Sequence, residues 1–190
     1  MQDADVFYPK STHEWRKWLE QHHLSKTSVW LVFYSKASQK PTLSWSEAVD
    51  IALCYGWIDS KKIKIDPETS HQFFSKRKAK STWSKINKDK ISKLIESGLM
   101  AKAGLDAVEV AQKNGSWTLL DEVEELIVPP DFEEALKAKP GAQEFYESLS
   151  KSVRKMMLSW IDFAKRPETR QSRISEIAEL ASKCQKPKQF

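Results

Sequence analysis

Apolar residues recur at helical spacing in several separate stretches of the chain. The pattern is clearest between 153 and 164, where the spacing is i, i+3, i+4, i+7, i+8 and i+11. These positions hold Val153, Met156, Met157, Trp160, Ile161 and Ala164. The same criterion predicts helices over 12–22, 44–55, 82–97 and 105–113, and several shorter helices in the last third of the chain. Ser11 and Ser44 each open an S-x-x-E capping box, which marks the start of the first two helices.

Three stretches have the patterns of strands. Residues 28–35, SVWLVFYS, are rich in β-formers and apolar on both faces, which favours a buried central strand. Residues 61–66 alternate, with Ile63 and Ile65 on one face, and a D-P-E-T turn leads into SHQFFSK. We therefore expect 70–76 to return as the antiparallel partner of 61–66.

The fold class that follows is α+β. We expect a small, mostly antiparallel sheet with helices over 1–118. The acidic stretch 121–125 and the V-P-P at 128–130 indicate a boundary. After it, we expect an all-helical part over 119–190 that packs on the first.

Composition narrows the class of protein. The two cysteines, Cys54 and Cys184, are far apart, and no CxxC or Cys/His cluster is present, so we expect no disulfide framework, no metal site and no cofactor. Residues 1–10 lack the basic and apolar segments of a signal peptide. No apolar stretch approaches the roughly 18 residues of a membrane helix, so we expect a cytoplasmic protein without membrane insertion.

Charge is unevenly distributed along the chain. The net charge is +5, yet 60–93 holds eleven Lys/Arg against three Asp/Glu, and 121–134 holds seven acids and no base. Three interpretations stay open: binding of a polyanion, an intramolecular charge match, or two solvated faces. Separately, the basic residues of 165–173 either form a solvated helix end or face the acidic segment 121–134.

The basic loop that opens the predicted helix 82–97 is the strongest candidate for a site. Side-chain cations beside a helix N-terminus bind phosphate, sulfate or carboxylate. Asp59 follows the predicted helix end and is expected to pair with Arg77 or Lys80, or to form the polar wall of a pocket. Asn87 is expected to face inward, as a structural brace or a ligand contact. The candidate ligand-binding residues are Asp59, Ser60, Arg77, Lys80, Ser81, Trp83, Ser84 and Asn87.

No complete catalytic constellation appears in the sequence. Cys54 has no neighbouring histidine to activate it and is interpreted as a small core residue. One alternative remains an enzyme on a small anionic substrate, with Asp59 as general base. Another is nucleic-acid binding through 60–93, where Phe73, Phe74 and Trp83 lie among the basic residues.

Several sequence words together resemble one family. EAVDIALCYGWIDS (47–60), KRKAKSTWSKIN (76–87), SGLMAKAG (97–104) and NGSW (114–117) resemble the YdeI/OmpD-associated, or bacteriocin-protection, proteins. VPPDFEEAL (128–136) and FAKRPETRQSRI (163–174) resemble that family's C-terminal OmdA segment. The family often has Pro-Arg in the basic loop, where this chain has Ser75-Lys76-Arg77-Lys78.

The resemblance implies a cytoplasmic bacterial protein linked to bacteriocin or antimicrobial stress and, by name, to an outer-membrane porin. It carries no reaction or catalytic residues. The leading hypothesis is a non-enzymatic stress-protection protein with a cleft for a small anion. A protein partner or a homodimer is also compatible with the sequence.

Overall fold

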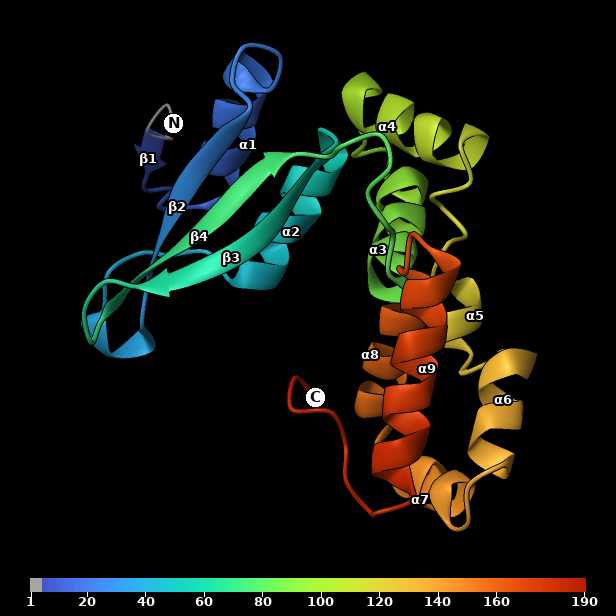
Figure 1. Cartoon of the computed structure of the whole chain (residues 1–190). Coiled ribbons are helices and arrows are strands. Elements are labelled where there is room, and N and C mark those ends of the chain that lie inside the picture. Colours follow the sequence, from blue (N-terminus) through green and yellow to red (C-terminus); the bar gives the residue numbers. More distant parts are fainter. Residues whose placement is uncertain (1–4) are drawn as a thin grey trace. The chain divides into compact units, whose positions relative to one another are not determined.

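The computed structural model describes residues 5–190. Residues 1–4, the start of the segment 1–10 that is expected not to be a signal peptide, lie outside the described residues. The chain divides into two compact units, Met1–Thr118 and Leu119–Phe190. Figure 1 shows their elements in the order of the chain.

The first unit is built on a mixed sheet. Within the described residues it has four strands in the order β1-β2-β4-β3, and all neighbours except the parallel pair β1–β2 are antiparallel. The strands are β1 (Asp5–Phe7), β2 (Ser28–Tyr34), β3 (Trp57–Lys64) and β4 (Thr69–Lys76). The mostly antiparallel sheet predicted from the sequence is confirmed. Strand β3 begins at Trp57 rather than at 61, because Gly56 (φ +71°) turns the chain directly from a helix end into the strand.

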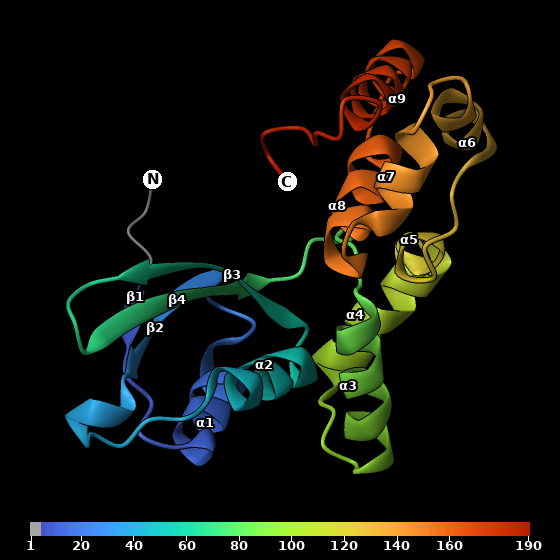
Figure 2. The ribbon, with the colours of Figure 1, turned by 90° about the horizontal axis from the view of Figure 1, so that it is seen from below.

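Two helices cover one face of this sheet. They are α1 (Thr12–His22) and α2 (Trp45–Cys54), each begun by the predicted capping serine, and Figure 2 shows both on the same side of the strands. Trp15 of α1 lies edge-on against Phe74, with ring centroids 5.5 Å apart, and donates from Nε1 to the Ala48 carbonyl at 3.0 Å. Trp18 makes a similar contact with Trp57 at 5.9 Å. Interlocked aromatic rings of this kind hold helices and sheet together.

Two more helices complete the first unit. Helix α3 (Lys85–Glu96) begins later than the sequence predicts, because the Ser84 hydroxyl accepts from the Asn87 N–H and caps it. Helix α4 (Lys102–Lys113) packs on the end of α2. A short 3₁₀ turn, η1 (Lys36–Ser38), lies between β2 and α2.

The second unit is all-helical, as predicted, and has its own core. Its helices are α5 (Asp121–Glu124), α6 (Pro130–Lys137), α7 (Ala142–Ser148), α8 (Lys151–Asp162) and α9 (Pro167–Ala181). The amphipathic stretch 153–164 becomes α8, which buries Met157, Leu158 and Ile161 but leaves Met156 42% exposed. The core also holds Phe132 and Tyr146, whose rings meet edge to face.

The acidic segment 121–134 forms ion pairs within this second unit, one of them with a base of 165–173. Arg170 donates from Nε and Nη2 to the two carboxylate oxygens of Asp131, at 2.7 and 3.0 Å, and from Nη1 to Asp162 at 3.0 Å. Lys155 pairs with Glu124 of the acidic segment. Part of the acidic block is therefore neutralised by the unit's own bases.

Candidate anion-binding cavity

Arg77 is the central residue of the candidate site. It directly follows β4, and its backbone N–H donates to the Gly56 carbonyl at 2.9 Å. Its guanidinium lies 3.6 Å above the ring of Trp83. Nη1 donates to the Thr82 carbonyl at 3.0 Å and to the Ser81 hydroxyl at 3.4 Å. Through these contacts, the basic loop that follows β4 packs around the guanidinium of Arg77.

The charge of Arg77 is incompletely compensated. Burial lowers the pKa of its guanidinium to about 10, and Asp59 opposes this shift only in part. The Nε atom is buried and has no hydrogen-bond partner among the described residues. Because a buried cation with an unused donor is costly, an anion that reached this group would be favoured.

A cavity of about 370 Å³ lies beside Arg77 in the first unit. Helix α4 forms one wall with Ala103, Ala107 and Val110, and Leu24 and Trp83 add further apolar surface. Such a surface suits the hydrocarbon part of a small organic ligand.

Two glycines allow α4 to form this wall. A Cβ at Gly56 would lie 3.0 Å from both the Ala103 carbonyl oxygen and the Ala107 Cβ. A Cβ at Gly104 would lie only 2.3 Å from the Cys54 carbonyl oxygen, which also accepts from the Ala101 N–H at 3.0 Å. The end of α2 and the start of α4 therefore meet through backbone, at a distance that only glycine permits.

Basic side chains surround the apolar wall. His23, Lys76 and Lys78 line the cavity, and Lys76 Nζ donates to the Leu24 carbonyl at 2.8 Å. Lys78 is exposed. The lining also includes one carboxylate, Asp106, which is paired with Lys102 at 2.8 Å. The local charge therefore favours an anionic ligand.

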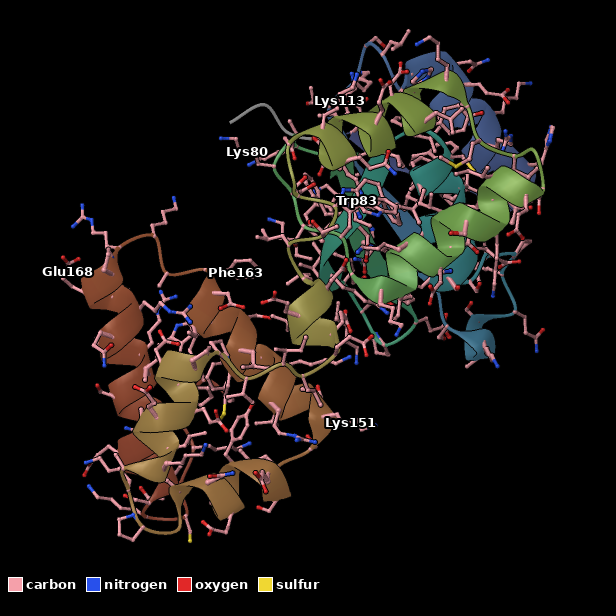
Figure 3. The ribbon with its side chains drawn as sticks, turned by 90° about the vertical axis from the view of Figure 1, so that its right-hand side faces the viewer. Lys80, Trp83, Lys113, Lys151, Phe163 and Glu168 are labelled. Carbon is pink, nitrogen blue, oxygen red and sulfur yellow. The ribbon has the colours of Figure 1, made fainter. Side chains whose placement is uncertain are left out.

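The structure brings only some of the predicted site residues together. Arg77 and Trp83 line the cavity, and Ser81 supports Arg77. Ser84 and Asn87 instead form the start of α3. Figure 3 shows Trp83 inside the first unit, whereas Lys80 extends from the outside of the loop.

Asp59 and Ser60 lie elsewhere, in strand β3. The Asp59 carboxylate accepts from Trp45 Nε1 at 2.8 Å and from Gln72 Nε2 at 3.0 Å, and Gln72 also reaches the Ser60 carbonyl at 3.4 Å. The ion pair of Asp59 with Arg77 or Lys80 expected from the sequence does not occur among the described residues. Asp59 is a structural acceptor that joins α2 to the sheet.

Sequence reasoning missed the residues that α1 and α4 contribute. His23 and Leu24 directly follow the last residue of the first helix, and Ala103 and Ala107 lie in a stretch whose small side chains resemble ordinary helix formers. The sequence signal that could have indicated this wall is the spacing A-x-x-x-A beside Gly104, because small residues in a helix often mark close packing against another segment. It does not reveal which segment packs there.

Three further observations, on metal ligands, membrane-spanning helices and the two cysteines, come from the part of the chain that the structure describes. It contains no group of three or more His, Cys, Asp or Glu side chains arranged to hold a metal ion. No helix there is long and apolar enough to cross a membrane. Both cysteines are free, and burial raises the pKa of the Cys54 thiol, as befits a core residue rather than a nucleophile.

Two family models match separate parts of the chain. Residues 7–107, which lie in the first unit, match a model described as "Domain of unknown function (DUF8412)". Residues 125–183, in the second unit, match the OmdA model, described as "Bacteriocin-protection, YdeI or OmpD-Associated". No curated protein and no solved structure matches the chain.

The predicted resemblance to YdeI/OmpD-associated proteins is therefore confirmed over 125–183. Most of the words in 47–117 that resemble the same family lie in the part matched by the other model. Because that model covers more than half of the chain, this protein belongs to the family described as "Domain of unknown function (DUF8412)", and its second unit carries an OmdA segment.

Proposed function

We propose that this protein is a non-enzymatic, cytoplasmic bacteriocin-protection protein that binds a small organic anion in the cavity beside Arg77. The observation that carries the proposal is the buried Nε of Arg77, which has no partner among the described residues and belongs to a cation in the cavity wall. The OmdA match supports the protective role. The two free cysteines are compatible with a reducing compartment.

The ligand that fits this cavity has two parts. A carboxylate, phosphate or sulfate group would lie beside the Arg77 guanidinium and approach the ammonium of Lys78. A short apolar or aromatic body would lie against Ala103, Ala107 and Val110. Charge-assisted hydrogen bonds are each worth roughly 1.5–3 kcal/mol, and the apolar contact adds about 25 cal/mol per Å² that is buried.

The contacts favour binding over catalysis. Asp59, the general base of the enzyme alternative, does not line the cavity and accepts from Trp45 and Gln72. The carboxylate that does line it, Asp106, is held by Lys102 and is 51% exposed. Such a solvated carboxylate, already paired with a lysine, is poorly placed to take a proton from a bound substrate.

A thermal-shift panel on the full chain tests the binding site. The probes are inorganic phosphate, sulfate, acetate and benzoate, at low and moderate salt. A ligand at about 100 times its Kd adds about 2.7 kcal/mol to the stability of the unit that binds it. We expect benzoate to raise the melting temperature more than acetate does, because only benzoate fills the apolar wall.

Two lysines of the same loop provide a matched pair of variants. Lys78 lines the cavity and Lys80 does not, although both are exposed. Lys78→Ala should weaken benzoate binding severalfold, whereas Lys80→Ala should leave it unchanged. Equal losses in both variants, or no response of the wild type to any anion, would show that the cavity is not an anion site.

The protective role has its own test. In a bacterial host, loss of the gene should increase sensitivity to a bacteriocin, and the wild-type gene should restore resistance. Lys78→Ala should restore it less well than Lys80→Ala. If Lys78→Ala restores resistance fully although it has lost ligand binding in vitro, protection does not depend on binding in the cavity.

A further inference from the structure

The face of the sheet opposite α1 and α2 is a second candidate surface. Side chains alternate along strands, so the register assigns Ser28, Trp30 and Val32 of β2 to this face, together with His71, Phe73 and Ser75 of β4. Figure 2 shows α1 and α2 on the other side of the strands. Among the described residues of the first unit, no helix covers this face.

Two aromatic rings lie side by side at its centre. Trp30 and Phe73 are register partners in neighbouring strands, with ring centroids 4.9 Å apart at an angle of 65°. The His71 ring lies 6.5 Å from Trp30. Both Trp30 and Phe73 are only partly buried, so their rings contribute to the surface.

A β-bulge places a cation over these rings. In β3, Ser60 and Lys61 both lie opposite Phe73, because Asp59 pairs with Phe74 and Lys62 with Gln72. The Lys61 ammonium is 5.2 Å from the Trp30 ring centroid and 5.5 Å from that of Phe73. One extra residue in the strand therefore turns Lys61 onto this face.

The next lysine belongs to the other side of the sheet. Lys62 pairs with Gln72, whose side chain is buried and bonded to Asp59 on the face that α2 covers. It lines a hollow there with Leu43 and Ser44. Lys61 and Lys62 thus carry the same charge and belong to the same strand, but they lie on opposite faces of the sheet.

The charge of the open face has one sign. The positions that β1 and β3 add by register are Val6, Ile58 and Ile63, all of them neutral. The nearest carboxylates in these strands lie elsewhere: Asp59 is on the covered face, and Asp5 is paired with Lys26 at 2.8 Å. The face therefore combines aromatic rings with a cation and lacks a carboxylate at its register positions.

We propose that this open sheet face binds single-stranded nucleic acid. Bases stack on aromatic rings regardless of sequence, and lysines contact the phosphates between them. A base on Trp30 or Phe73 would displace the Lys61 ammonium from the rings and leave it beside the adjoining phosphate. The Lys61 ammonium over the rings, with no carboxylate at the register positions of the described strands, favours this polyanion over a protein surface of mixed charge.

This surface differs from the one that the sequence suggested. Of the three aromatic residues in the basic segment, Phe74 and Trp83 are core residues with exposed fractions of 0% and 2%, so neither can stack on a base. Only Phe73 remains available. Its partner ring, Trp30, comes from a strand that the sequence pattern predicts to be buried on both faces.

Fluorescence anisotropy with a labelled 12-nucleotide oligothymidine tests the proposal on the full chain. Binding should be detectable at about 50 mM salt and should weaken as salt increases, with a slope of roughly −0.7 for each phosphate contact in a single strand. Lys61→Glu should raise the Kd at least about tenfold. Lys62→Glu, which changes the net charge equally, should raise it no more than about twofold.

A second variant tests the stacking without a change of charge. Phe73→Leu keeps an apolar side chain and should still weaken binding, with circular dichroism confirming that the fold is retained. Equal effects of Lys61→Glu and Lys62→Glu would overturn the proposal, as would equal affinity for a duplex of the same length. Undetectable binding would overturn it too. Lys78→Ala should bind the oligonucleotide normally; if it alone loses binding, the oligonucleotide occupies the cavity instead.

Discussion

Gly104→Ala tests whether backbone contact between α2 and α4 builds the cavity wall. In an isolated helix this change would stabilise, because alanine is favoured over glycine by about 1 kcal/mol. Here the added methyl group would lie 2.3 Å from the Cys54 carbonyl oxygen and 2.7 Å from its carbon. Backbone atoms cannot rotate away as a side chain can, so α4 must move.

The expected cost follows from these contacts. Overpacking a close contact typically costs about 1–3 kcal/mol. Moving α4 also weakens the 3.0 Å hydrogen bond from the Ala101 N–H to the same carbonyl, a contribution of about 1 kcal/mol. After the gain in helix propensity is subtracted, we expect a net destabilisation of about 1–3 kcal/mol.

Urea unfolding followed by tryptophan fluorescence measures this cost. Seven of the eight tryptophans lie in the first unit and only Trp160 in the second, so the signal reports mainly on the first unit. Gln112→Ala, at an exposed position of the same helix, is the control and should change stability by no more than about 0.5 kcal/mol. The reasoning is refuted if Gly104→Ala is as stable as the wild type or more stable.

Three further predictions concern individual side chains. Tyr146→Phe should stabilise the second unit by about 1 kcal/mol in thermal unfolding, because the buried Tyr146 hydroxyl has no partner among the described residues. Asp131→Asn should destabilise the same unit by about 0.5–1 kcal/mol at neutral pH. Arg170 lowers the pKa of Asp131. This contribution is therefore present above the unfolded-state pKa and is lost as pH falls through the folded-state pKa, so the difference between variant and wild type should shrink as the solution is acidified. Ser44→Ala should cost about 1 kcal/mol in urea unfolding, because it removes the capping box with Glu47.

The sequence predicts well those elements whose signals are local. Ser11 and Ser44 mark helix starts that the structure confirms. The start of α3 was misplaced because Ser81 and Ser84 both have capping chemistry and Trp83 between them looks like a helical apolar position. Its true role depends on a distant ring, Trp117, whose centroid lies 5.0 Å away.

The candidate site was predicted only in part for the same reason. Arg77 could be identified from the local charge and the loop, but its partner could not. The expected carboxylate, Asp59, instead accepts hydrogen bonds from Trp45 and Gln72. The contact with Trp45 depends on how α2 crosses the sheet, which the sequence does not show. The cavity wall is supplied by α4, and side-chain periodicity carries no information on which helix end another helix meets.

The glycine contacts around the cavity also bear on the order of folding. The walls of the cavity come from residues as distant in sequence as His23 and Val110. The cavity is therefore complete only after the end of α1, the end of β4, the basic loop and α4 have all come together. Contacts of such long sequence separation tend to form late. An anion bound at Arg77 would therefore stabilise the docked position of α4. It would slow amide exchange in α4 and at Gly56 together, and it would protect both from proteases.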